Sequence, residues 1–89
     1  MKTARITDLV PGASSDEFHI TVDIDGRGET HQATVITMDV PGHGKAMTVR
    51  FPPEFYKPKF RKLIVTMGLL VRKAYEGKTY TLPIEAAIY

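Results

Sequence analysis

The residues whose types and spacing first suggest chemistry are the acidic residues and glycines of segment 23–29, Asp-Ile-Asp-Gly-Arg-Gly-Glu. Such a segment could begin a calcium-binding loop, which needs oxygen ligands at its positions 1, 3, 5 and 12 and a helix on each side. Arg27 occupies the fifth position and Thr34 the twelfth, and the preceding residues alternate as they do in a strand. We therefore interpret 25–28 as the turn of a β-hairpin, whose glycines supply the positive φ of a tight turn.

A second candidate is Gly42-His43-Gly44-Lys45, which has part of the pattern of a phosphate-binding loop. That loop needs a glycine five residues before its Gly-Lys pair, and a serine or threonine after the lysine. Asp39 and Ala46 stand at those positions, so the motif is excluded. A weaker alternative remains open, in which the backbone N–H groups of this turn hold an anion beside Lys45.

The three histidines raise the question of a metal site. His19 and His31 fall on opposite faces of the predicted hairpin and cannot share one ion, and His43 lies in a loop. We interpret His31 as a satisfied histidine at a sheet edge. With no cysteine and no signature serine motif, the sequence predicts no catalytic residue, no metal and no cofactor, and thus no enzyme.

The clearest structural pattern is the alternation of Phe18, Ile20, Val22 and Ile24 with polar residues, which predicts a strand with one buried face. Segment 30–40 returns as its antiparallel partner. We expect Ile24 to lie opposite residue 29, Val22 opposite 31, Ile20 opposite 33 and Phe18 opposite 35. This register gives one apolar face and one polar face.

The remaining patterns predict three more strands and one helix. The strands are expected at 3–8, around 47–51 and near 79–84. A helix of about 18 residues begins at Pro58, has its apolar residues at helical spacing and ends before Gly77. The fold class is therefore α+β, within a single domain of residues 1–89. Four strands, the helix and a last strand follow one another, with the long amphipathic helix packed across one face of an antiparallel sheet of about five strands.

Charge is distributed unevenly along the 89 residues. Residues 1–44 hold seven acidic and three basic residues, a net charge of −4, whereas residues 45–89 hold three acidic and nine basic residues, a net charge of +6. Such asymmetry suggests an anionic partner. The sequence has no apolar run long enough for a membrane span and no cysteine, and we expect a cytoplasmic protein without membrane contact.

The predicted helix is the most informative element for function. No acidic residue stands between Phe55 and Tyr75. Projected at 100° per residue, two aliphatic and five basic residues share the outward side of the helix or its margin. These seven residues, which we call the basic helix face, are Lys59, Arg61, Lys62, Val65, Leu69, Arg72 and Lys73. An apolar centre inside a charged rim is typical of an interface. Gly68, at the border of the apolar side, lets the helix approach closely either the sheet or a partner, and we favour close packing within the domain.

We expect a small non-enzymatic interaction module that docks through the basic helix face onto an acidic or nucleic-acid-handling protein. A small cysteine-free domain with an uneven charge distribution fits phage or mobile-element proteins that inhibit a host complex. Two alternatives stay open: a nucleic-acid-binding domain that uses the same cations, and a solvated face that keeps the protein soluble. The apolar tail 86–89 adds either to the sheet or to a groove on a partner or a second copy, as in a homodimer.

Overall fold

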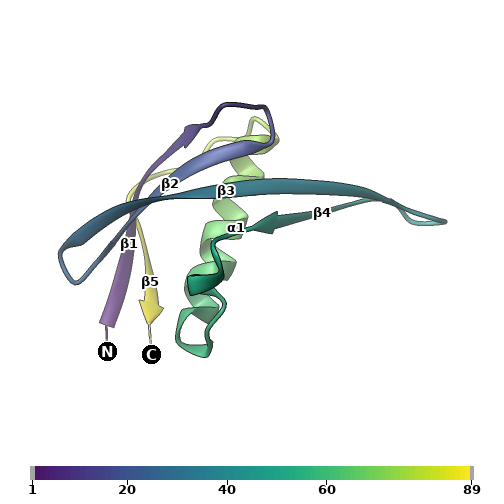
Figure 1. Cartoon of the computed structure of the whole chain (residues 1–89). Helices are drawn as coiled ribbons and strands as arrows, with labels where there is room; N and C mark the ends of the chain where they lie inside the picture. Colours follow the sequence, from purple (N-terminus) through teal and green to yellow (C-terminus); the bar gives the residue numbers. More distant parts are fainter. Residues whose placement is uncertain (1, 89) are drawn as a thin grey trace.

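A computed structural model describes residues 2–88, which form a five-stranded antiparallel sheet with one helix against its inner face (Figure 1). The strand order across the sheet is β4-β3-β2-β1-β5. The strands are β1 (Lys2–Pro11), β2 (Glu17–Ile24), β3 (Arg27–Val40), β4 (Gly44–Arg50) and β5 (Ile84–Ile88). Two 3₁₀ turns, η1 (Pro53–Phe55) and η2 (Pro58–Phe60), precede the helix α1 (Arg61–Tyr75). The predicted α+β class and order of elements are confirmed.

The β2–β3 hairpin turns on two residues, Asp25 and Gly26, both with positive φ (55° and 80°). Ile24 pairs with Arg27 and Ile20 with His31, so the predicted register is wrong by two residues. A four-residue turn was expected, whereas two residues with positive φ suit a hairpin better because their twist matches that of the strands. A shift of two residues keeps every side chain on its face, so the predicted apolar face is correct.

Strand β1 contains a bulge, which interrupts the alternation of buried and exposed residues along its sequence. Its pairing with β2 shifts between Ile6 and Asp8. Ala4, Ile6 and Leu9 are all buried, although the strict alternation of a regular strand would place Leu9 on the face opposite Ala4 and Ile6. A bulge inserts one extra residue and so reverses the alternation beyond it. The strand also extends to Pro11, past the predicted range of 3–8.

Helix α1 begins at Arg61, three residues later than predicted. Phe60, with φ −101° and ψ 11°, separates the 3₁₀ turn η2 from the helix. Pro58 therefore opens η2 instead of the α-helix itself. The side of α1 that faces the sheet buries Leu63, Met67, Leu70 and Val71.

The last strand lies at Ile84–Ile88, and its predicted position near 79–84 is wrong. Pro83 lacks the N–H that a ladder hydrogen bond requires, which interrupts the predicted strand. The apolar tail forms β5 instead and pairs with β1, from Ile6 opposite Ile84 to Lys2 opposite Ile88. The tail therefore adds to the sheet through Ile88, while Tyr89 lies outside the described residues.

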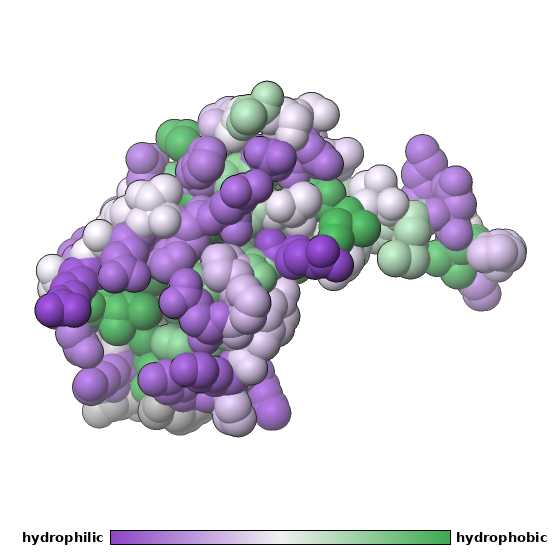
Figure 2. All heavy atoms as spheres, in the orientation of Figure 1, coloured by the Kyte–Doolittle hydropathy of each residue, from purple (hydrophilic) through white to green (hydrophobic). Residues whose placement is uncertain are grey.

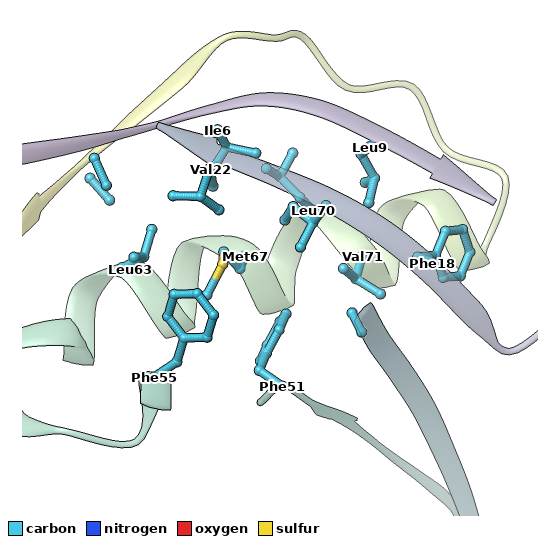
Figure 3. Close-up of a cluster of buried hydrophobic side chains, with 14 of the residues drawn as sticks. Ile6, Leu9, Phe18, Val22, Phe51, Phe55, Leu63, Met67, Leu70 and Val71 are labelled. Carbon is cyan, nitrogen blue, oxygen red and sulfur yellow. The ribbon is translucent and has the colours of Figure 1, made fainter. Parts of the chain in front are cut away.

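The buried side chains form one core between the sheet and α1. Figure 3 shows Ile6 and Val22 on the strands above Leu63 and Met67 of the helix, with the ring of Phe55 beside Met67. Among residues 2–88, every fully buried side chain is apolar. The core fixes which side of the helix is left to solvent.

The long strand β3 serves two pairings. It pairs with β2 up to Thr34 and with β4 from Thr34 onward. Beyond Ile36, the β3–β4 hairpin has no third strand, and Figures 1 and 2 show it standing clear of the body. We call residues 37–46 the arm. The arm explains a radius of gyration of 13.4 Å, where a compact chain of this length has roughly 12 Å.

Candidate interaction surface

Six of the seven residues of the basic helix face lie in α1, and the seventh, Lys59, lies in η2 just before it. The five basic residues are exposed, and Val65 and Leu69 are 58% and 54% exposed. These two aliphatic residues are four positions apart and therefore neighbours on the helix surface. Together they form a small apolar centre between the cations at the two ends of α1.

The positive charge of this surface is not balanced by acidic residues of its own helix. Helix α1 contains no acidic residue. Among the described residues, Arg61, Arg72 and Lys73 form no ion pair, and the Nζ of Lys59 lies 5.0 Å from the ring centroid of Phe60. Unpaired like charges on one helix face are destabilising by a few tenths of a kcal/mol per pair. Helix α1 thus carries only positive formal charge.

Two grooves flank the outward side of α1, because the helix lies between the two edge strands of the curled sheet. The first, which we call the β4 groove, has a volume of about 260 Å³. Its lining includes Met47, Val49, Ile64, Gly68, Leu69 and Arg72. The second, the β5 groove, has a volume of about 470 Å³ and is lined by residues that include Arg61, Lys62, Val65, Thr66, Glu85 and Ala87. Each groove joins part of the basic helix face to a sheet edge.

Gly68 does not pack closely within the domain, so that interpretation is wrong. No atom of the domain outside the local helix backbone lies within 4 Å of the place where its Cβ would sit. The glycine opens onto the β4 groove. Sequence reasoning missed the strand side of both grooves, since Met47, Val49 and Ala87 show only ordinary strand patterns. The signal that could have found them is the position of β4 and β5 at the sheet edges.

A second polar cluster surrounds His31, on the half of β3 that pairs with β2 and not with β4. Its Nδ1 lies 3.4 Å from Glu54 Oε1 and its Nε2 lies 3.6 Å from Glu29 Oε2. Its ring meets that of Phe55 edge-on at 4.7 Å between centroids. His31 is thus a partly buried histidine between two carboxylates, in keeping with the predicted role. His19 pairs with Gln32, on the face opposite His31.

The remaining sequence candidates lie elsewhere. The turn at Gly42 and His43 forms the tip of the arm, away from α1 (Figure 1). In residues 2–88, no three side chains of His, Cys, Asp or Glu are grouped so that they could hold a metal ion.

No helix in the described chain is long and apolar enough to cross a membrane. Neither protein-family models, nor curated proteins, nor solved structures give a match to this chain.

Proposed function

We propose that this protein is a non-enzymatic interaction module that docks through the basic helix face onto an acidic surface of a protein partner. The observation that carries the proposal is the exposure of Val65 and Leu69 among cations, on a helix without an acidic residue. Burial of the two aliphatic side chains supplies affinity, at about 25 cal/mol per Å² of apolar surface. The surrounding cations speed association with an acidic surface and select against basic ones.

A protein partner is favoured over nucleic acid by the same two aliphatic residues. Phosphate neutralisation uses cations and has no need of Val65 or Leu69. Single-stranded nucleic acids are bound largely by stacking on aromatic side chains, and the basic helix face has none, since the one aromatic residue of α1 is Tyr75 at its last position. Just before the helix, Phe55 is buried, and Tyr56, which is 55% exposed, accepts a hydrogen bond through its hydroxyl from the N–H of Phe51.

Occupation of an acidic surface blocks whatever else that surface binds. Inhibition of a host complex in the cytoplasm, of the kind that small phage proteins exert, is the form of activity that we propose. If the occupied surface normally handles nucleic acid, the module acts as a competitor for it.

The test uses a purified partner, first captured from the native host and identified, and then titrated against the protein by calorimetry. The variant Val65→Glu/Leu69→Glu is expected to weaken binding at least 100-fold, because it places two charges in the apolar centre. The control Ala13→Glu/Ser15→Glu adds the same charge to the exposed β1–β2 loop and is expected to bind as the wild type. Equal affinity of both variants would exclude the basic helix face as the docking surface.

The nucleic-acid alternative is tested by titrating duplex and single-stranded DNA and RNA at several salt concentrations. A slope of several units of log affinity against log salt would support phosphate neutralisation. The proposed function predicts no measurable binding of these nucleic acids at 50 mM salt. A steep salt dependence would overturn the proposed function if Val65→Glu/Leu69→Glu altered it only by the effect of the two added charges.

A further inference from the structure

Gly68 stands in the middle of α1 with open space where a side chain would be. A glycine in a helix interior costs about 1 kcal/mol relative to alanine. No close packing in the described chain offsets this cost, because an added Cβ would have no atom within 4 Å apart from its two chain neighbours and the local helix backbone. The missing side chain therefore matters for something that approaches the helix from outside.

The space beside Gly68 is the β4 groove, and its walls are mostly apolar. Met47 and Val49 line it from β4, and Ile64 and Leu69 line it from α1. Its volume of about 260 Å³ lies below the range of about 300–1,000 Å³ in which small-molecule sites are found. The size and lining suit an apolar side chain of a partner better than a free ligand.

The groove runs beside a strand edge that can accept another strand. β4 is the terminal strand of the sheet, so alternate N–H and C=O groups along it point away from β3. An extended peptide that pairs with such an edge places every second side chain on the same face as Met47 and Val49. On β4 that face is the one toward α1, where the groove lies.

The positive charge at the groove comes from its α1 wall, where Arg72 is the one charged lining residue. β4 also contains Lys45 and Arg50, which do not line the groove, and neither β4 nor α1 has an acidic residue. Cations on an edge strand also discourage unwanted strand pairing, but that role makes no use of the open space at Gly68. Charge complementarity therefore favours an acidic occupant.

We propose that the β4 groove binds an extended acidic segment of the partner, which adds to the sheet as a sixth strand. This rests on the proposed function and specifies its partner. The segment pairs with the outer edge of β4, inserts an apolar side chain beside Gly68 and sets a carboxylate against Arg72. Gly68 lacks a side chain because the inserted group occupies its place.

The probe is the synthetic peptide Glu-Leu-Glu-Leu-Glu-Leu-Glu with blocked ends, titrated into the ¹⁵N-labelled protein and followed by NMR. We expect the amide signals of Thr48, Val49 and Gly68 to shift with peptide concentration. The peptide with lysine in place of glutamate is expected to cause no such shifts. A version with proline at the second and third leucine positions cannot pair as a strand and is expected to bind at least tenfold more weakly.

The variant Gly68→Met fills the groove, and is expected to weaken peptide binding at least tenfold while keeping a folded spectrum, since methionine favours helix. The matched control Thr66→Met makes a substitution on the β5 side of the helix and is expected to bind as the wild type. Absence of shifts with the acidic peptide, shifts confined to the β5 groove, or equal binding by Gly68→Met would overturn the inference.

The same variants separate this inference from the proposed function. If the captured partner is released by Val65→Glu/Leu69→Glu but still binds Gly68→Met with wild-type affinity, the groove is not the site and the docking surface stands. If sedimentation shows that wild type is a dimer and Gly68→Met is a monomer, the groove is occupied by a second copy, and the proposal of an acidic partner segment is wrong.

Discussion

Met67 and Val65 are two positions apart in α1 and lie on opposite sides of it: Met67 has no exposed surface, whereas Val65 is 58% exposed. Successive residues turn by about 100°, so residues two positions apart lie on nearly opposite sides of the helix. The first side chain belongs to the core and the second to the proposed docking surface.

Substitution of these two residues by alanine is expected to change the free energy of unfolding by very different amounts. Met67→Ala should lower the free energy of unfolding by about 2–5 kcal/mol, because it leaves a cavity in the core. Val65→Ala should change it by less than about 0.5 kcal/mol, since alanine favours helix and the side chain packs little. Urea denaturation followed by circular dichroism measures both. A loss from Val65→Ala as large as that from Met67→Ala would contradict the orientation of α1.

Gly26 and Gly28 differ in backbone conformation although they are only two residues apart. Gly26 has a φ of 80° in the hairpin turn, whereas Gly28 lies in β3 opposite Asp23. Gly26→Ala is expected to lower the free energy of unfolding by about 1–2 kcal/mol, the cost of left-handed backbone for a residue with a Cβ. Gly28→Ala, with nothing within 4 Å of the added Cβ, should be nearly neutral. Equal losses in thermal or urea denaturation would rule out the two-residue turn.

Glu76, just after α1, has a lowered pKa because Lys78 donates a hydrogen bond to its carboxylate and adds a positive charge 2.9 Å away. A carboxylate whose pKa is lower in the folded state stabilises that state above the unfolded pKa, and this contribution is lost as the pH falls through the folded pKa. Lys78→Ala is expected to raise the pKa of Glu76 toward its ordinary value. Carboxyl ¹³C shifts followed against pH measure it.

The matched control for this titration is Lys73→Ala, which removes a cation that has no part in the lowered pKa of Glu76. It should leave the titration of Glu76 as in the wild type. An unchanged pKa in Lys78→Ala would show that the ion pair does not form in solution.

Much of the fold follows from the sequence because burial imposes a period. The alternation from Phe18 to Ile24 and the helical spacing after Pro58 each have a single buried side, which fixes the type of element and the face. The errors occur where a local feature breaks the period. The bulge after Ile6 hides the pattern of β1, and Pro83 moves the last strand toward the C-terminus.

Only the part of the candidate surface that lies on the helix could be predicted from the sequence. The exposure of Val65 and Leu69 follows from their position relative to the apolar side of α1. The β4 groove joins residues such as Met47 and Gly68, which are 21 positions apart, and depends on which strands end the sheet. Strand order is set by long-range pairing, which a single sequence does not specify.

The double pairing of β3 makes the stability of the hairpin ends unequal. In the arm, between Thr37 and Ala46, both faces of the hairpin are exposed to solvent, and each of its two strands pairs only with the other. Its hydrogen bonds can therefore open by fraying from the tip inward, while those that join β3 to β2 break only with the core. A single continuous strand thus carries slow and fast amide exchange in its two halves, and Thr34, where β2 and β4 meet on it, marks the border between them.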